Sequence, residues 1–402
     1  MIPVIEETNV HAKIISPKDG HYFFGYYDLQ PFDSTGRFHL CNRTAFEDRI
    51  PDENDVCELG MLEIETGEFI KFAETTAWNF QQGAMLQWYQ DDDHVIFNTR
   101  ENGAFGSCVM NIKTGAKRKL PMAIASLSKD GKKALCINFS RIFDFRPGYG
   151  YIGIPDEHFL EKAPSDDGVF VMDTETGACH LAISYAQMRS AFPKAPYSDE
   201  KLLVNHITYN LSGSRFVFLL RNFPENGGKW ITLLLTCDEF GNVRKLADYA
   251  THSHYHWKND RELLIVSTKT EENKKLGLYV FNDENGNASL LSEPDPAHPL
   301  KDIHCLYSPN RRYIMGDGYP DGYPNTNLSY RWLHFIDTSS GHDTVLGKYL
   351  SFRSGRAELE YRCDLHARFD RTGRYVSFDS NHIGRRCVCL LDLDKLNGYE
   401  YR

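Results

Sequence analysis

Apolar and polar positions along the chain repeat in a two-part pattern. The first part is an aromatic or apolar residue, a short polar turn and a β-rich run, and it begins at Phe32, Trp88, Leu127, Tyr209, Trp257, Tyr307 and Phe369. The second part is an alternating apolar stretch that ends in a turn glycine, at Gly67, Gly115, Gly177, Gly241, Gly286, Gly341 and Gly398. Alternation bounded by turns rich in Asp, Asn, Ser and Gly is typical of β-hairpins.

The two parts alternate seven times without interruption. Each repeat supplies two hairpins and therefore four strands. The pattern predicts an all-β fold, a seven-bladed β-propeller with four-stranded blades, as a single domain over residues 1–402. Leu127 and Tyr209 are 82 residues apart, which predicts an insertion at about 141–200 between the third and fourth blade hairpins, with a short helix near 186–200. Whether the N-terminal stretch adds a strand to the last blade stays open.

A register of histidines accompanies the first part of the repeat. The position three residues before each marker holds His206, His254, His304 and His366 in four consecutive repeats, and Leu29, Met85 and Ile124 in the first three. With 16 histidines in 402 residues, chance would place fewer than one there. These positions lie on the innermost strand of each blade, so we expect the imidazoles to converge at one mouth of the central channel. Two residues upstream, the strand period adds to the same face His252, Asp302 and Asp364.

Converging imidazoles and carboxylates are what a divalent metal site requires. Mixed nitrogen and oxygen ligands favour Mn²⁺ or Zn²⁺, whereas so much imidazole disfavours Ca²⁺. The alternative is that the histidines are hydrogen-bonded structural residues that plug the channel.

Other polar side chains suggest a binding site for an acidic ligand. Arginines end three corresponding apolar runs, at Arg100, Arg141 and Arg221. They are either rim charges or a pocket for a carboxylate, to which guanidinium offers a bidentate fork. The stretch RPGYGY, which starts at Arg146, predicts a rigid turn that exposes Tyr149 and Tyr151. Gln82 precedes the second blade, near the expected channel mouth.

Composition narrows the class of partner. The formal net charge of −10 argues against nucleic acid. No apolar run is long enough to span a membrane, and the N-terminus shows no signal-peptide pattern. No G-x-S-x-G elbow, P-loop or H-E-x-x-H motif occurs, so serine-triad and nucleotide chemistry lack support. We expect no membrane partner and a cytoplasmic location, or a periplasmic or secreted one if a signal peptide has been removed.

Cysteine usage agrees with a reducing compartment. The ten cysteines form no C-x-x-C pair and are expected to be mostly reduced, buried thiols. Cys387 and Cys389 should share one face of a strand. The neighbouring basic turn, with His382, Arg385 and Arg386, is expected to be a solvated loop.

Five segments resemble the oligogalacturonate lyases: WNFQQGAMLQW, FRPGYGY, NHITYN, HSHYHW and DLHARFDRTGRYVSFDS. The chain is also similar to the related propeller lyases that cut ulvan and rhamnose–glucuronate linkages. The first resemblance implies a cytoplasmic seven-bladed propeller that cleaves small uronide oligosaccharides by β-elimination, with Mn²⁺ in the channel mouth.

The same resemblance implies roles for individual residues. The metal histidines of the oligogalacturonate lyases fall on His304 and His366, with His254 close to the reacting sugar, and their catalytic arginine falls on Arg221. The last metal motif of that family has two histidines two residues apart and a glutamine upstream, whereas this chain has Asp364 and His366. The departure leaves the metal and its ligand set open.

Resemblance to the ulvan-type lyases instead implies a histidine base, a tyrosine acid and a structural metal. His206, with Tyr149 or Tyr151, would then be the catalytic candidates.

The expected reaction is therefore the carbon–oxygen lyase reaction on an acidic oligosaccharide. A metal or an arginine neutralises the uronate carboxylate as the α-proton leaves, and His206 or His254 transfers the proton. The candidate metal ligands are His304, His366, His254 and Asp364, and the candidate substrate-binding residues are Gln82, Arg100, Arg141 and Arg146. The alternatives are a non-catalytic propeller that binds a glycan or a protein, and hydrolysis by Asp302 and Asp364. The oligomeric state stays open.

Overall fold

The computed structural model describes residues 11–194, 199–223, 230–270, 272, 275–292, 302–318, 321–322, 329–352, 358–396 and 398–401. Their strands form seven sheets of successive antiparallel strands, which confirms the predicted seven-bladed β-propeller with four-stranded blades. The chain divides into two compact units. Unit 1 comprises Met1–Asn98, Val109–Lys117 and Lys301–Arg402, and unit 2 comprises Thr99–Cys108 and Arg118–Leu300.

Unit 1 holds the first, sixth and seventh sheets. The first sheet consists of β2 (His21–Phe23), β3 (Phe38–Thr44), β4 (Cys57–Glu63) and β5 (Phe69–Thr75). The sixth consists of β22 (Leu306–Tyr307), β23 (Tyr313–Asp317), β25 (Ser329–Asp337) and β26 (Asp343–Ser351), with β24 (Asp321–Gly322) paired to β25. The seventh consists of β27 (Arg368–Phe369), β28 (Tyr375–Ser380), β29 (Cys387–Asp392) and β1 (Lys13–Ile14).

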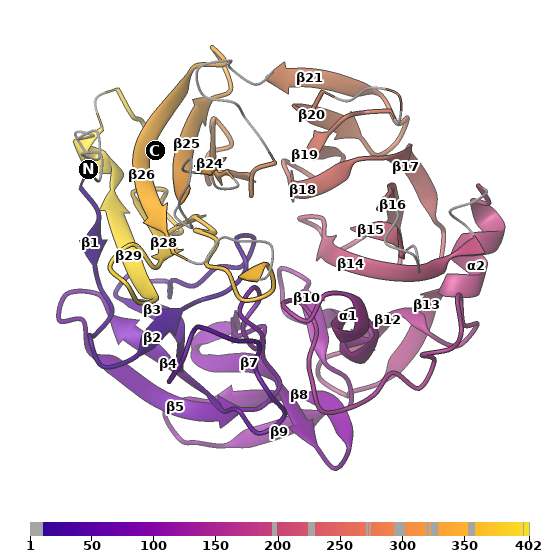
Figure 1. The fold of residues 1–402 in the computed structure, drawn as a ribbon, viewed down its shortest axis with the longest axis horizontal. Helices are drawn as coiled ribbons and strands as arrows, with labels where there is room; N and C mark the ends of the chain where they lie inside the picture. Colours follow the sequence, from indigo (N-terminus) through magenta and orange to yellow (C-terminus); the bar gives the residue numbers. More distant parts are fainter. Residues whose placement is uncertain are drawn as a thin grey trace. The chain divides into compact units, whose positions relative to one another are not determined.

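The N-terminal stretch does add a strand to the last blade. β1 pairs antiparallel with β29, and Ile14 lies opposite Cys389 (Figure 1). Burial explains the pairing, because Ile15 packs in one apolar cluster with Tyr22, Phe32 and Val388. The two ends of the described chain are therefore joined within a single sheet.

Unit 2 holds the third, fourth and fifth sheets. The third consists of β10 (Ile124–Leu127), β11 (Lys133–Cys136), β12 (Gly168–Asp173) and β13 (Cys179–Ser184). The fourth consists of β14 (Lys201–Tyr209), β15 (Phe216–Phe223), β16 (Thr232–Cys237) and β17 (Arg244–Ala250). The fifth consists of β18 (His252–Trp257), β19 (Glu262–Ser267), β20 (Gly277–Asn282) and β21 (Ala288–Ser292). The second sheet has the order β6 (Gln87–Tyr89), β7 (Asp91–Glu101), β8 (Ala104–Asn111) and β9 (Lys117–Leu120).

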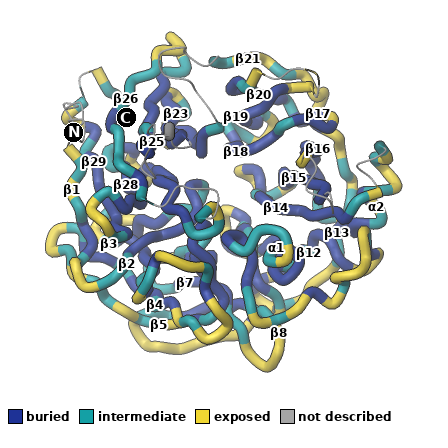
Figure 2. Tube along the Cα trace, viewed as in Figure 1, coloured by how far each residue is buried: buried dark blue, intermediate teal, exposed yellow. Residues whose placement is uncertain are grey.

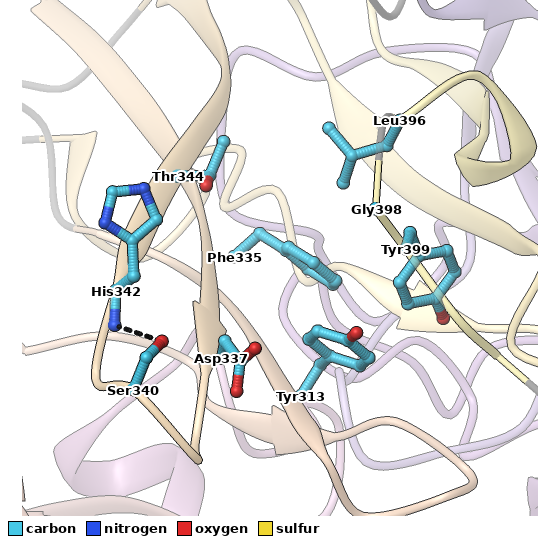
Figure 3. A pocket seen from close by; sticks show the side chains of 9 residues that line it. All are labelled: Tyr313, Phe335, Asp337, Ser340, His342, Thr344, Leu396, Gly398 and Tyr399. Carbon is cyan, nitrogen blue, oxygen red and sulfur yellow. Dashed lines mark hydrogen bonds between the residues drawn. The ribbon is translucent and has the colours of Figure 1, made fainter.

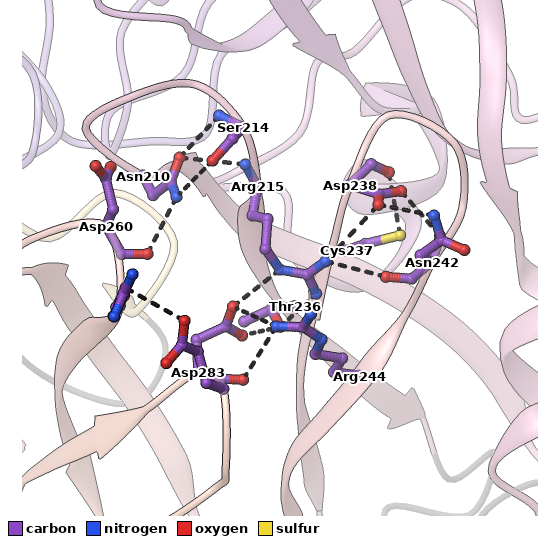
Figure 4. A network of polar contacts seen from close by, with 12 residues as sticks. Asn210, Ser214, Arg215, Thr236, Cys237, Asp238, Asn242, Arg244, Asp260 and Asp283 are labelled. Carbon is purple, nitrogen blue, oxygen red and sulfur yellow. Dashed lines mark hydrogen bonds and ion pairs between the residues drawn. The ribbon is translucent and has the colours of Figure 1, made fainter.

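Central strands of unit 2 are buried on both faces. Every residue of β15 and β16 is buried, and Figure 2 shows this core in dark blue. Polar contacts join the fourth and fifth sheets at the ends of these strands. The carboxylate of Asp283 binds Arg215 at 2.9 Å and Arg244 at 3.3 Å, and it accepts a hydrogen bond from Thr236 (Figure 4).

All seven predicted turn glycines have a positive φ, between 70° and 83°. In this left-handed region a Cβ atom is unfavourable, so glycine is the preferred residue at the turn. The turn glycine that marks the second part of the repeat is therefore required by the left-handed backbone of that turn, which occurs once in each blade.

The insertion differs from the prediction in its position. Its first part, with helix α1 (Phe139–Phe145), lies inside the third blade between β11 and β12, and only the part with helix α2 (Tyr185–Ala191) follows that blade. The predicted helix near 186–200 extends partly over residues 195–198, which lie outside the described residues. Arg141 belongs to α1 and does not end a strand. Neither α1, α2 nor any other helix among the described residues is long and apolar enough to cross a bilayer.

A buried histidine in β3 makes the stability sensitive to acid. Burial, and then the nearby charge of Arg368, lower the pKa of His39 to about 3. The unfolded chain binds this proton near pH 6.5, so the unfolded state takes up more protons and the free energy of unfolding falls as pH drops from about 6.5 to 3. We expect His39→Gln to remove roughly 3 to 5 kcal/mol of this pH dependence, measured by urea unfolding across that range. Substitution of the exposed His342 by Gln should leave the slope unchanged; an equal slope in His39→Gln would contradict the prediction.

Candidate functional site

The histidine register coincides with irregular backbone. His206 and His366 have positive φ values of 47° and 44°, and Met85, at the same place in the second repeat, has 52°. The β14 ladder shifts register between Asn205 and Ile207, and the β18 ladder shifts between His252 and Tyr255. Such bulges redirect side chains. A non-glycine residue in this conformation costs about 1–3 kcal/mol and is often found at functional sites.

The expected same-face pairing is wrong for His252 and His254. The bulge between His252 and Tyr255 breaks the strand period, and both ring nitrogens of His252 are used, by Ser267 Oγ at 2.9 Å and the Asp248 carbonyl at 2.8 Å. His252 is therefore a structural histidine. His304 and His366 do not lie in strands either, because β22 and β27 begin two residues after them.

Three residues of unit 1 form a candidate metal group. The histidine–carboxylate group consists of His304, Asp364 and His366, whose ligand atoms all lie within 4.8 Å of one another. The two imidazole rings are 4.3 Å apart and nearly perpendicular, and all three side chains are buried. Asp302, which the strand period had paired with His304, is not a member of this group.

The ring of His366 is oriented by a backbone carbonyl. Its Nδ1 donates to the oxygen of Gly25 at 2.8 Å, and within the described part of the chain its buried Nε2 has no hydrogen-bond partner. Burial, helped by the nearby charges of His304 and Arg368, holds the pKa of His366 well below its usual value. The ring is therefore neutral, with the lone pair on Nε2, which is the state that binds a metal.

Arginines surround Asp364. Burial opposes its ionisation, but Arg331, whose Nη2 is 2.5 Å away, and Arg362, whose Nε is 2.9 Å away, outweigh burial and hold the pKa of Asp364 well below its usual value. The lowered pKa favours the ionised form of Asp364, which disfavours its use as the proton donor in the hydrolytic alternative. A second carboxylate, Asp317, lies 3.2 Å from His304 Nδ1.

Two tyrosines complete the surroundings of the group and were not predicted. The ring of Tyr26 lies 5.1 Å from His366, and that of Tyr27 lies 5.5 Å from His304. The second-layer position of the histidine register, two residues before Leu29, holds Tyr27. Extending that layer to the first repeat would have found it.

The close packing of Gly25 fixes the position of the loop that carries Tyr26 and Tyr27. Its φ is +129°, and a Cβ atom there would lie 2.7 Å from the Gln82 carbonyl oxygen. Arg368 also donates to the Gly25 oxygen at 2.6 Å while it pairs with Asp379 at 2.7 Å. The predicted substrate residue Gln82 therefore packs through its backbone against the loop that orients His366.

We expect Gly25→Ala to weaken metal binding by about 10–100-fold, because it displaces the carbonyl that orients His366. Metal affinity measured by calorimetry, with the melting temperature as a second readout, tests this. Gly36→Ala is the matched control, since Gly36 also has a positive φ but no atom within 4 Å of an added Cβ. Equal affinities in the two variants would contradict the prediction.

Unit 2 contains the second candidate group, the tyrosine–histidine cluster of Arg146, Tyr149, His206 and His254. The guanidinium of Arg146 lies 4.7 Å from the Tyr149 ring centre. Tyr149 contacts His206 edge-on at 5.6 Å, and His206 contacts His254 at 5.5 Å. Arg146 is half-buried, whereas the three rings are buried. Within unit 2, a guanidinium, a phenol ring and two imidazole rings therefore lie in a row, each next to the following one.

Other predicted residues have different surroundings. Tyr149 and Tyr151 were expected to be exposed and are both buried, because the turn packs on α1. Tyr151 stacks on Phe139 at 4.2 Å. The five donors of Arg141 meet Asp156 and the carbonyls of four residues: Leu202, His158, Glu161 and Lys162. These contacts favour structural roles for Arg141 and Tyr151.

The remaining arginines, Arg100 and Arg221, are not members of these groups. Arg100 donates to the Ile152 carbonyl at 3.2 Å. Arg221 is buried in β15, and its charge contributes to the lowered pKa of His252, where burial is the larger cause. Their predicted contacts with substrate stay predictions, as does the predicted place of His254 among the metal ligands.

A cavity of about 160 Å³ in unit 1 lies away from the predicted residues. Figure 3 shows Phe335, Tyr313 and Tyr399 along it. The rings of Tyr313 and Phe335 stack at 4.9 Å, and Tyr399 packs edge-on against Tyr313. This cavity therefore marks where the C-terminal residues pack on the sixth sheet.

Comparisons with known proteins agree with the fold. No protein-family model and no curated protein matches the chain. The chain is similar to an oligogalacturonate lyase from Vibrio parahaemolyticus, with a TM-score of 0.68, 15% identity and coverage of 99% of this chain and 97% of that one. It is also similar to an oligogalacturonate lyase in complex with manganese, with a TM-score of 0.65, 15% identity and coverage of 96% and 94%. The tricorn protease follows, with a TM-score of 0.52, 10% identity and coverage of 96% and 34%. At these identities, the likeness is one of fold.

Proposed function

We propose that the protein is a carbon–oxygen lyase that cleaves a uronic-acid-containing oligosaccharide by β-elimination. The observation that carries the proposal is the buried, neutral His366, whose Nε2 has no hydrogen-bond partner among the described residues and which lies beside His304 and Asp364. A buried polar atom without a partner costs about 1–3 kcal/mol, so a ligand for it is expected. The shared fold with oligogalacturonate lyases, one of them solved with manganese, supports this choice of reaction.

The histidine–carboxylate group fits a divalent cation. Two imidazole nitrogens and one carboxylate oxygen within 4.8 Å of one another suit Mn²⁺ or Zn²⁺. Bound there, the cation would act as a Lewis acid towards the uronate carboxylate. Arg331 and Arg362 both pair with Asp364, and Asp317 lies beside His304. A divalent cation bound next to these two arginines would attract an anionic ligand.

We assign proton transfer to the tyrosine–histidine cluster. An imidazole beside a phenol is an acid–base pair of the kind that β-elimination needs. His206 or His254 removes the α-proton, and Tyr149 protonates the leaving oxygen. Within the same unit, the half-buried guanidinium of Arg146 would attract an acidic sugar.

The other predicted residues have secondary roles in this proposal. Gln82 and Arg100 are further candidates for binding the sugar. Arg221 is a clamp rather than a base, because an arginine base would need a strongly lowered pKa. The proposed partner is an acidic oligosaccharide, and the proposed location is the cytoplasm.

An elimination assay tests the proposal. The purified protein is incubated with Mn²⁺ or Zn²⁺ and a panel of small uronides, and the conjugated unsaturated uronate is followed by ultraviolet absorbance. Tyr149→Phe should lower kcat by about 10²–10⁴-fold. The matched control Tyr151→Phe removes one hydroxyl from a residue that stacks on Phe139 and should change kcat little.

Metal-loaded, folded protein that yields no unsaturated product from any uronide would overturn the proposal. The histidines would then be structural residues of a propeller that only binds. If the product forms and Tyr149→Phe matches Tyr151→Phe, the lyase assignment holds and the phenol is not the acid.

A further inference from the structure

A second group of metal-ligating side chains lies in the last blade, in unit 1. The cysteine group consists of Cys387 and Cys389 on β29 and His382 in the turn before it, and their ligand atoms lie within 4.8 Å of one another. The two sulfurs are 3.8 Å apart. His382 was expected in a solvated loop, but its ring reaches the sulfurs, and only the shared strand face of the two cysteines was predicted.

Local geometry explains why the three residues meet. Cys387 and Cys389 are two apart on β29 and lie opposite Ser380 and Phe378 of β28. The turn between the strands is closed by the bond from Gly384 N to Asn381 O at 2.9 Å, and Gly384 has a φ of 82°. This tight turn brings His382 back over the face that carries both sulfurs.

The imidazole is held on two sides. Its Nδ1 is 2.7 Å from Ser380 Oγ, and the ring of Tyr349 packs against it at 5.6 Å. A hydrogen bond at one ring nitrogen sets the tautomer and frees the other for a ligand. The histidine is therefore oriented as metal-binding histidines usually are.

Burial agrees with this arrangement. Cys387 and Cys389 are 0% exposed, whereas His382 is half-buried, so the group has one side from which an ion can enter.

We propose that His382, Cys387 and Cys389 form a second metal site for a thiophilic ion, with Zn²⁺ as the expected occupant. Two sulfurs and one imidazole nitrogen provide three of the four tetrahedral ligands that Zn²⁺ takes, and solvent at the half-buried side of His382 completes the set. Hard cations such as Mg²⁺ and Ca²⁺ take oxygen ligands instead.

The position of the group gives the ion a structural role. β29 is bonded to β28 on one side and to β1 on the other, so the sheet that joins the two ends of the chain contains the site. The ion ties the turn before β29 to that sheet. The proposal is independent of lyase activity.

Cobalt titration of the full-length protein tests the site. Co²⁺ bound to thiolate gives a charge-transfer band that imidazole and carboxylate ligands do not produce. The titration is made in His366→Asn protein, which lacks a complete histidine–carboxylate group. We expect one equivalent of Co²⁺ with this band, its displacement by Zn²⁺, and a higher melting temperature with Zn²⁺.

Two variants and a control make the outcome specific. Cys387→Ser/Cys389→Ser should lose the band, and His382→Ala, a change in a half-buried turn, should weaken it without unfolding the sheet. Cys57→Ser removes a buried thiol outside the group and should keep the band. The proposal is overturned if folded, reduced protein shows no band, if the band survives loss of both cysteines, or if thiol titration and mass show Cys387 and Cys389 joined as a disulfide.

Discussion

Substituting His366 by Asn is expected to lower kcat/KM for uronide cleavage by about 10²–10³-fold, the usual effect of removing one group that stabilises developing charge. Asn is chosen because it tolerates left-handed backbone, and His366 has a φ of 44°. The substitution therefore removes the Nε2 ligand without adding backbone strain. The divalent metal proposed for the histidine–carboxylate group should be lost in parallel, which lowers the metal content by one equivalent.

The measurement combines metal content by mass spectrometry with the elimination assay on the same sample. Substitution of the exposed His342 by Asn is the control and should keep both the metal and the activity. Full activity in His366→Asn protein that has lost this equivalent of metal would show that the ion is not required, and the lyase proposal would then rest on the tyrosine–histidine cluster alone.

Substituting Arg331 by Met is expected to lower the free energy of unfolding by about 3–5 kcal/mol. Arg331 and Asp364 are both 0% exposed, with 2.5 Å between Nη2 and Oδ1. Removing one partner leaves a buried carboxylate that is still paired with Arg362. Met keeps much of the side-chain volume, so the loss reports charge rather than a cavity.

Urea unfolding of three proteins separates these contributions. Arg312→Met removes an exposed partner of Glu400 and should leave the midpoint unchanged. Arg331→Met/Asp364→Leu removes both members of this pair and should recover part of the stability lost in Arg331→Met, because buried Arg362 then loses its carboxylate. A double variant with no recovery at all would show that the uncompensated charge of Asp364 does not cause the loss in Arg331→Met.

The number of blades could be predicted from the sequence because the strand and turn patterns that define each blade are local. Each hairpin turn follows its strand within a few residues, and all seven turn glycines share a φ between 70° and 83°. The histidine register found His304 and His366 for the same reason, since both stand at fixed distances from a repeat marker. Asp364 came from period-two spacing, although the loop that holds it is not a strand.

The residues that contact His366, His304 and Asp364 could not be predicted from the local sequence pattern. The Gly25 carbonyl that orients His366 is 341 residues away along the chain, and Asp317 and Arg331 reach the group from β23 and β25. The bulge in β18 turned His252 towards Ser267 and away from its expected partner. A period of two holds only while the ladder is regular.

The sequence by itself therefore determined the repeat, its strands and the residues nearest the proposed chemistry. Tertiary structure alone decided which charges meet. Arg141 binds Asp156 and four carbonyls rather than remaining available at a strand end, and His382 meets Cys387 and Cys389 across a turn. The physical reason is that strand and turn propensities act over a few neighbours, whereas burial of a charge or a thiol is satisfied by whatever group the fold brings within about 3 Å.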